Sequence, residues 1–150
     1  MRFVFLTQYF PPEVGASQVR LLATAKALQA AGHDVEVVTA LPNHPKGEIF
    51  PSYRGRFFAH DTVDGISVQR VWLYAATGAG RKRLLNYLSF TFTCLIGLAR
   101  VKRPDYLFVE SPPLFLALPG FLASRAWNAR LIFNVADLWP DSVEAMGLVS

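Results

Sequence analysis

The segments RFVFLT at residues 2–7 and VEVVT at residues 35–39 decide the fold. The first is a short apolar run rich in aromatic and β-branched residues, which is typical of a buried parallel strand. Between the two segments, residues 17–32 carry apolar side chains at helical spacing and end at Gly32, a residue that ends many helices. Strand, helix and strand in this order predict a βαβ unit with parallel strands.

The same alternation continues along the chain. We expect a strand at residues 65–73, a helix at 81–103, a strand at 106–109, a helix at 114–127 kinked at Pro119, and a strand at 131–135. Residues 41–64 are rich in proline, glycine and aromatic residues without a period, which indicates an ordered excursion over the strand ends. The sequence therefore predicts one α/β domain of 150 residues with a doubly wound, mostly parallel, Rossmann-like sheet.

The amino-acid composition indicates where the protein works in the cell and which classes of partner it binds. The chain is 52% hydrophobic and 17% charged, so we expect some apolar surface to meet something other than water. No RNA-binding or zinc-finger signature accompanies its basic residues, so we expect no nucleic-acid partner. The single cysteine, Cys94, excludes an internal disulfide and is expected to be a buried apolar residue. Residues 3–6 are too short for a signal peptide core, so we expect a cytoplasmic location.

Ligands of open parallel sheets gather at the carboxyl ends of the strands, where helix N-termini carry positive partial charge. Gly15, after the first strand, permits close approach of a phosphate, although a tight turn alone would also require glycine. After the second strand, Asn43, His44 and Lys46 form a set able to bind hydroxyls or phosphate, unless they are simply solvated. The G-x-G-x-x-G fingerprint is missing, which disfavours a nucleotide-dependent oxidoreductase.

Carboxylates follow two further strands. Glu110 and Ser111 follow the strand at 106–109, and Asp137 follows the strand at 131–135. Two carboxylates near one cleft can position sugar hydroxyls, and either can instead cap the next helix. The sequence leaves both roles open.

An ordered series of motifs makes a resemblance specific. Over nearly all of its 150 residues the chain resembles the N-terminal domain of glycosyltransferase family 4. The motifs that carry this resemblance are, in order, TQYFPPEVGA, AxxLQAAGHDVEVVTALPNHPKG, PSYRG, RLLNYLSF, ESPPLF and DLWPDS. The likeness is closest to bacterial enzymes that add sugars to lipid-linked precursors of surface polysaccharides, including fucosaminyltransferase-like and colanic-acid-type enzymes. The resemblance implies the acceptor-side half of a GT-B enzyme.

Such an enzyme transfers a sugar from a nucleotide donor with retention of configuration and without a metal or other cofactor. The resemblance places the donor diphosphate at Gly15 and Ala16, where many relatives have two glycines. It places the transferred sugar near Asp137, beside Ala136 at a position that is often His. The C-terminal donor-binding domain is absent from this chain, so we expect little activity from the 150 residues alone.

The acceptor is expected to be a lipid-linked sugar. Its predicted binding residues lie in the loops after the second and fourth strands: Asn43, His44, Lys46, Glu110 and Ser111. The alternative function is a stand-alone flavodoxin-like binding module without catalysis. A reading frame that continues past Ser150 into a second βαβ series would favour the enzyme.

A membrane contact is expected from the apolar stretch at residues 84–99. As a helix it spans about 24 Å, less than the roughly 30 Å hydrocarbon core, and it is a poor transmembrane candidate. It can lie on an anionic membrane surface, on the inner face of the plasma membrane, or cover one face of the sheet, or do both. The basic residues expected to contact the membrane are Arg81, Lys82, Arg83, Arg100, Lys102 and Arg103.

Overall fold

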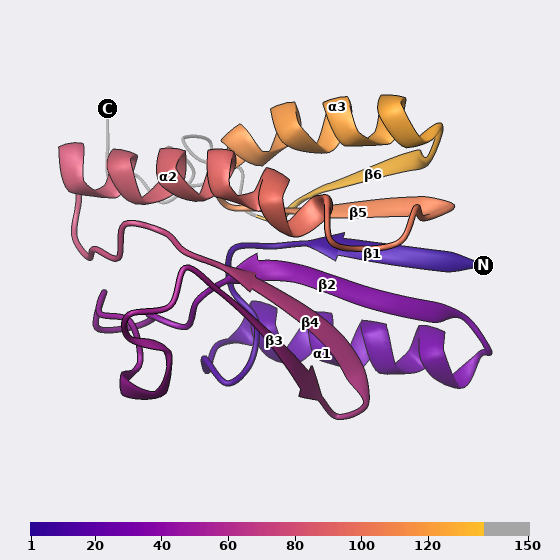
Figure 1. The fold of residues 1–150 in the computed structure, drawn as a ribbon, viewed down its shortest axis with the longest axis horizontal. Helices are drawn as coiled ribbons and strands as arrows, with labels where there is room; N and C mark the ends of the chain where they lie inside the picture. Colours follow the sequence, from indigo (N-terminus) through magenta and orange to yellow (C-terminus); the bar gives the residue numbers. More distant parts are fainter. Residues whose placement is uncertain (137–150) are drawn as a thin grey trace, which may run out of the picture.

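The computed structural model describes residues 1–136 and contains one six-stranded sheet, in the order β3-β4-β2-β1-β5-β6 (Figure 1). All neighbouring strands are parallel except β3 and β4, which are antiparallel. The α/β class and the mostly parallel sheet are thus confirmed. The strands are β1 (Arg2–Leu6), β2 (Asp34–Ala40), β3 (Phe58–Val63), β4 (Ile66–Val71), β5 (Tyr106–Ser111) and β6 (Arg130–Val135).

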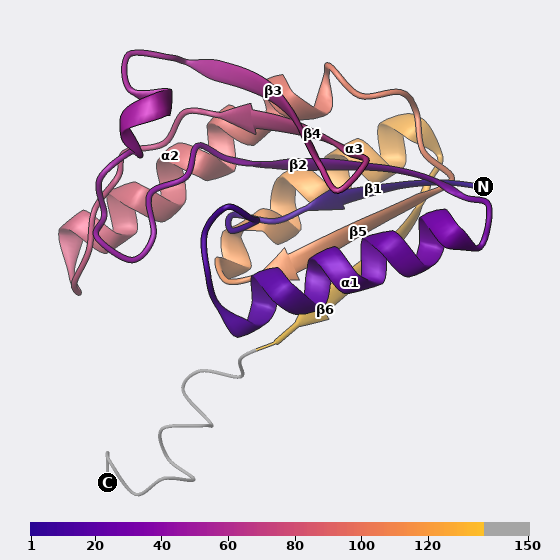
Figure 2. The same cartoon turned by 90° about the horizontal axis from the view of Figure 1, so that it is seen from below.

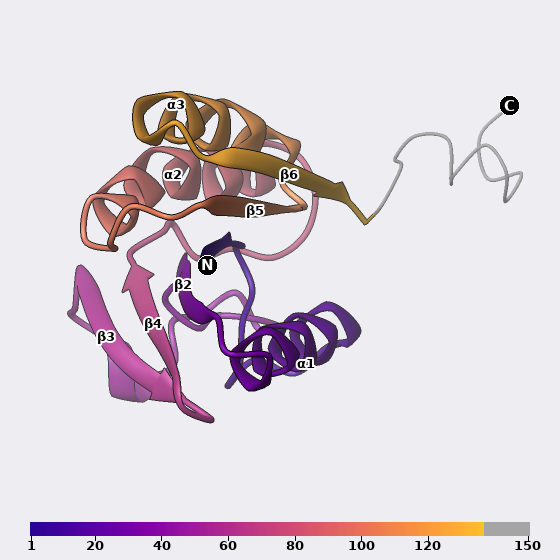
Figure 3. The same cartoon turned by 90° about the vertical axis from the view of Figure 1, so that its right-hand side faces the viewer.

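Helices cover both faces of the sheet, as a doubly wound fold requires. Helix α1 (Ala16–Ala30) lies on one face, whereas α2 (Arg81–Leu98) and α3 (Ala117–Trp127) lie side by side on the other (Figure 3). Two short 3₁₀ turns, η1 (Pro51–Tyr53) and η2 (Leu114–Leu116), complete the described elements.

The first strand is apolar on both sides because both of its faces are buried. Val4 and Leu6 belong to the cluster beneath α2 and α3, and Phe5 belongs to the cluster beneath α1. Cys94 is buried in the first cluster, as expected, and burial raises the pKa of its thiol to about 12. At Gly97 helix α2 comes so close to the sheet that an added Cβ would lie 2.5 Å from a methyl of Val38.

Strand β3 was not predicted, because residues 41–64 lack a clear alternation of apolar and polar side chains. It pairs with β4 through a turn at Asp64 and Gly65, whose φ angles are +49° and +82°. An Asp-Gly pair with two positive φ angles is the preferred two-residue hairpin turn, since it matches the twist of the strands. This dipeptide was the available signal for the hairpin.

Two expectations about helices were also wrong. Helix α2 ends at Leu98, and the segment beyond it turns so that Asp105 donates from its backbone N–H to the carbonyl of Arg2 at 2.9 Å. Pro119 lies in the first turn of α3, where a backbone N–H has no partner within the helix, so the expected kink has no cause. Asp137 lies outside the described residues.

Candidate functional site

Three loops meet at the carboxyl edge of the sheet. They follow β1, β2 and β4, and the last leads into the first turn of α2 (Figures 1 and 2). The close spacing of these loops depends on Gly47, whose φ is +68° and whose added Cβ would lie 2.6 Å from the backbone nitrogen of Thr77. Only glycine accepts both the positive φ and this contact without strain.

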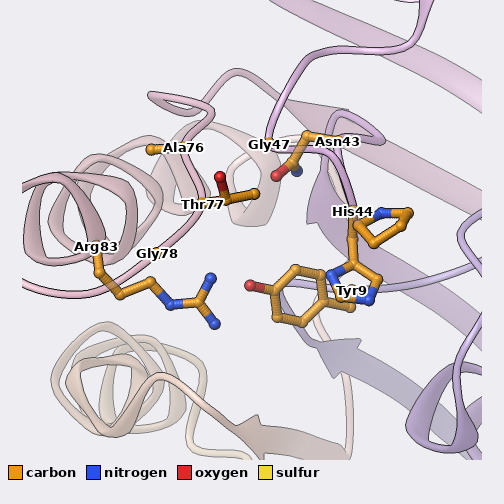
Figure 4. A pocket seen from close by; sticks show the side chains of 9 residues that line it. Tyr9, Asn43, His44, Gly47, Ala76, Thr77, Gly78 and Arg83 are labelled. Atoms are coloured by element: carbon orange, nitrogen blue, oxygen red, sulfur yellow. The ribbon is translucent and has the colours of Figure 1, made fainter.

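An open cavity of about 320 Å³ lies between these loops. Its wall includes Tyr9 after β1, Asn43 and His44 after β2, Thr77 before α2, and Arg83 in α2. In Figure 4 the guanidinium of Arg83 and the hydroxyl of Tyr9 point toward one another, and the ring of His44 lies beside that of Tyr9. Polar groups from four chain segments therefore converge on one cavity.

The cavity is electropositive. The guanidinium carbon of Arg83 lies 4.6 Å from the ring centre of Tyr87, and no carboxylate within residues 1–136 forms an ion pair with it. Burial raises the pKa of Tyr9 to about 12, although Arg83 opposes this shift. Tyr9 is therefore a neutral hydroxyl at pH 7. A cation beside neutral donors is suited to bind the oxygens of a phosphate or a sugar.

Glu13 joins the loops after β1 and β2. One carboxylate oxygen accepts backbone N–H groups of Asn43 and His44 at 2.8 and 2.9 Å, and the other accepts that of Phe10 at 3.2 Å. Burial raises the pKa of Glu13 above its usual value, although these three N–H donors act in the opposite direction. Glu13 thus fixes the backbone on which Asn43 and His44 stand.

Gln8 ties the end of β1 to α2. Its amide nitrogen donates to Oδ1 of Asn86 at 2.7 Å, and Asn86 in turn donates to the carbonyl of Tyr74 at 2.8 Å. Both amide side chains are fully buried. This chain of hydrogen bonds fixes the start of α2, and with it Arg83, relative to Tyr9.

A buried arginine supports the loop after β1 from the side of the β3–β4 hairpin. Arg70 is fully buried and donates to the carboxylate of Asp61 and to the carbonyl of Pro11. Burial alone would raise the pKa of Asp61, but hydrogen bonds from Tyr53 and Arg70 hold it below its usual value. The ion pair therefore stays charged at neutral pH and holds the loop.

A second polar group lies where the strand order reverses, between β1 and β5. The carboxylate of Glu110 is buried and pairs with Arg20 of α1, while its other oxygen accepts a hydrogen bond from Asn134 at 2.6 Å. Ser111, the next residue, is also buried. Both oxygens of Glu110 are engaged, so its direct contact is with protein groups.

Helix α1 begins beside this point. Gly15 precedes its first residue, Ala16, and no side chain caps the N-terminus and no acidic residue occupies the first turn. A Cβ at Gly15 would lie 2.5 Å from the amide oxygen of the buried Gln18. The open N-terminus carries positive partial charge toward the same edge of the sheet.

The structure brings only some of the predicted site residues together. Asn43 and His44 line the cavity, whereas Lys46 is exposed next to it. Glu110 and Ser111 are not part of its wall, and their contact with an acceptor stays a prediction. Asp137 lies outside the described residues, so its role also stays a prediction.

Tyr9 and Glu13 were not predicted as site residues, and Arg83 was predicted only to contact a membrane. Tyr9 follows the first strand as Asn43 follows the second, which was the available signal. Nothing local indicates that Glu13 reaches the backbone 30 residues away.

The other basic residues predicted to contact a membrane are spread over the domain. The guanidinium carbon of Arg100 lies 3.8 Å from the ring centre of Phe58. Lys102 and Arg103 lie near the amino ends of the strands, and Arg81 and Lys82 are exposed at the start of α2.

Comparisons with known proteins agree with this architecture. The chain is 30% identical over 125 residues to WcaI of Escherichia coli, described as a colanic acid biosynthesis glycosyl transferase; the match covers 81% of this chain and 30% of that protein. This chain therefore spans about a third of the length of its relative. It also resembles the C-terminal domain of a hydrogenase from Pyrococcus furiosus, with a TM-score of 0.55, 13% identity and coverage of 89% and 90% of the two chains. That likeness concerns the fold alone.

The family model of the glycosyl transferase 4-like domain matches residues 15–149. The match includes α1 and its N-terminus, the loop after β2, and Arg83 of the cavity. The expected resemblance is confirmed, and this chain belongs to the family of glycosyl transferase 4-like domains.

Proposed function

We propose that this chain is the acceptor-side domain of a retaining, metal-independent glycosyltransferase that uses a nucleotide-sugar donor. The acceptor is a phosphate-containing, lipid-linked sugar used in the synthesis of a surface polysaccharide or lipopolysaccharide. A separate donor-binding domain completes the active site. A lipid-linked acceptor would bring the enzyme to the cytoplasmic face of the plasma membrane.

The cavity between Tyr9, His44 and Arg83 carries this proposal. It combines a cation that has no carboxylate partner within residues 1–136 with neutral hydrogen-bond donors. Such a set recognises the phosphate and the hydroxyl groups of a phosphosugar. Asn43 and Lys46 stand in the same loop as His44, so the acceptor loop expected from the sequence forms one wall.

The donor diphosphate fits the N-terminus of α1. No side chain caps this N-terminus, and the first-turn N–H groups point toward the carboxyl edge of the sheet. Ala16 adds only a methyl group, and Asp137 remains our candidate for the polar group near the transferred sugar. Glu110 acts through Arg20 and Asn134, which it holds in place at the same edge.

The test uses the full-length enzyme, a panel of nucleotide sugars and a lipid-linked acceptor in detergent. Replacing Arg83 by Gln removes a charge-assisted hydrogen bond of about 1.5–3 kcal/mol, so the KM for the acceptor should rise about tenfold to 100-fold. The KM for the donor should be unchanged. Arg130→Gln, at the opposite edge of the sheet, is the matched control.

The stereochemistry is tested separately. The anomeric configuration of the product, determined by NMR, should equal that of the donor, and chelation should leave the rate unchanged. An inverted product would refute the retaining mechanism. An Arg83→Gln enzyme with an unchanged acceptor KM would refute the assignment of the cavity to the acceptor.

A further inference from the structure

The outer faces of α2 and α3 carry an exposed apolar surface. Ten large apolar side chains, each more than a third exposed, occupy positions on these helices and on the adjoining turn η2. Because α2 and α3 lie side by side on one face of the sheet (Figures 1 and 3), the residues form one surface, called here the α2–α3 face. They are Leu84, Leu85, Phe92, Leu95, Ile96, Leu114, Phe115, Leu118, Phe121 and Leu122. Soluble monomers rarely leave such a surface in water.

The charged residues of the two helices have one sign. The sequence contains no Asp or Glu between residues 65 and 104 or between residues 111 and 136, which includes all of α2 and α3. Arg81 and Lys82 stand exposed at the start of α2, and Arg125 is exposed in α3. Within residues 1–136, the face is therefore apolar in its centre, and the charged side chains that α2 and α3 themselves contribute are all cationic.

The helices have the dimensions of an interfacial element. Helix α2 has 18 residues and extends about 27 Å. Within residues 1–136, no helix is both long enough and apolar enough to cross a membrane. The inward side of α2 packs on β2 and β4 through Phe90, Cys94 and Leu98, so only its outward side is available to a partner.

We propose that the α2–α3 face docks on the surface of an anionic lipid bilayer. Phe92, Phe121 and their apolar neighbours enter the boundary between headgroups and acyl chains, while Arg81 and Lys82 contact anionic headgroups. Phe and Leu side chains accompanied by Arg and Lys, with no acidic residue on either helix, are the composition of elements that lie on anionic lipid. This charge complementarity favours lipid over a second copy or another segment of this chain.

This docking also orients the acceptor cavity. Arg83 lines the cavity, and the next two residues, Leu84 and Leu85, belong to the α2–α3 face. The cavity therefore lies beside the edge of the docked surface. A lipid-linked acceptor can reach Arg83 while its chain stays in the bilayer. This last step rests on the proposed function, whereas the docking itself does not.

The test is cosedimentation of the full-length protein with vesicles at low ionic strength. Vesicles of phosphatidylcholine alone are compared with vesicles containing about a third phosphatidylglycerol. The wild type should bind only the anionic vesicles. Phe92→Glu/Phe121→Glu should weaken this binding about tenfold or more, and Arg81→Gln/Lys82→Gln should weaken it and reduce its salt dependence. The matched control is Val19→Glu, at an exposed apolar position of α1 on the opposite face, and it should bind as the wild type does.

Both sets of variants are checked for folding by circular dichroism and for transfer to a short-chain acceptor in detergent. Retained transfer with lost vesicle binding supports the docking surface, and lost transfer in the wild type would instead count against the proposed function. Equal binding of wild type and Phe92→Glu/Phe121→Glu would overturn the proposal. It would also fall if the wild type were a dimer that this double variant makes monomeric, or if hydrogen exchange showed the face covered without vesicles.

Discussion

Replacing Glu13 by Ala should loosen the cavity between Tyr9, His44 and Arg83 and lower the stability of the domain. In the wild type, the carboxylate accepts three backbone N–H groups, from Phe10, Asn43 and His44. Alanine leaves all three donors without an acceptor. The bonds to Phe10 and Asn43 are buried, whereas the bond to His44 is partly exposed and can be replaced by water.

The magnitude follows from the two buried donors. An unsatisfied buried donor costs about 1–3 kcal/mol, so the free energy of unfolding should fall by about 2 kcal/mol or more. In a domain of this size, 1 kcal/mol corresponds to about 2–4 °C, so the Tm should fall by about 4–8 °C. Glu48→Ala, at an exposed carboxylate in the loop after β2, should leave Tm nearly unchanged and serves as the control.

The pH dependence supplies an independent check. The pKa of Glu13 is raised in the folded state, so the native protein holds its proton above pH 4.5, where the unfolded chain has lost it. Stability contributed by Glu13 is therefore fully present at low pH and declines as the pH rises through this window. The stability difference between wild type and Glu13→Ala should narrow from pH 4 to pH 7.

Thermal unfolding followed by circular dichroism measures the Tm, and amide hydrogen exchange measures the protection of the Asn43 and His44 N–H groups. Both amides should be protected in the wild type and exchange faster in Glu13→Ala. A change in Tm of less than about 1 °C, with both amides still protected, would refute the role assigned to Glu13.

Three further predictions concern close contacts and charge. Gly47→Ala should raise the acceptor KM of the full-length enzyme about tenfold or more, because its Cβ would lie 2.6 Å from the Thr77 backbone nitrogen; kinetics with the lipid-linked acceptor measure this. Gly97→Ala should lower the free energy of unfolding by about 1–3 kcal/mol through overpacking against Val38, as measured in urea. Arg20→Met should destabilise by about 1–2 kcal/mol, since Arg20 is half exposed and the buried Glu110 keeps only Asn134.

Each of these variants has a contrary outcome. Unchanged acceptor kinetics in Gly47→Ala would show that the two loops can separate without affecting the cavity. Full stability of Gly97→Ala would mean that α2 shifts freely on the sheet. An Arg20→Met protein as stable as the wild type would show that water replaces the guanidinium beside Glu110.

The fold was largely predictable because its signals are local. The apolar run of β1 and the valine-rich run of β2 indicate buried strands, and the spacing of apolar residues before Gly32 indicates α1. Strand β3 was not predicted because it lies at the edge of the sheet and only one of its six residues is buried, which leaves little apolar pattern. Pro119 was assigned a kink because the sequence does not show that α3 begins only two residues earlier, at Ala117.

The site was predictable only in part. The sequence by itself determined which loops follow the strands, and hence that Gly15, Asn43 and His44 would share the carboxyl edge of the sheet. Only the tertiary structure decided that Arg83 turns into the cavity toward Tyr9.

Other contacts also depended on the folded chain. Glu13 connects the loops after β1 and β2 by hydrogen bonds, and the carboxylate of Glu110 pairs with Arg20, which is 90 residues distant in the chain. The physical reason is that strands and helices can be predicted from the spacing of apolar residues that are neighbours in the sequence. The partner of a buried charge, in contrast, depends on strand order and helix placement, which bring distant segments together.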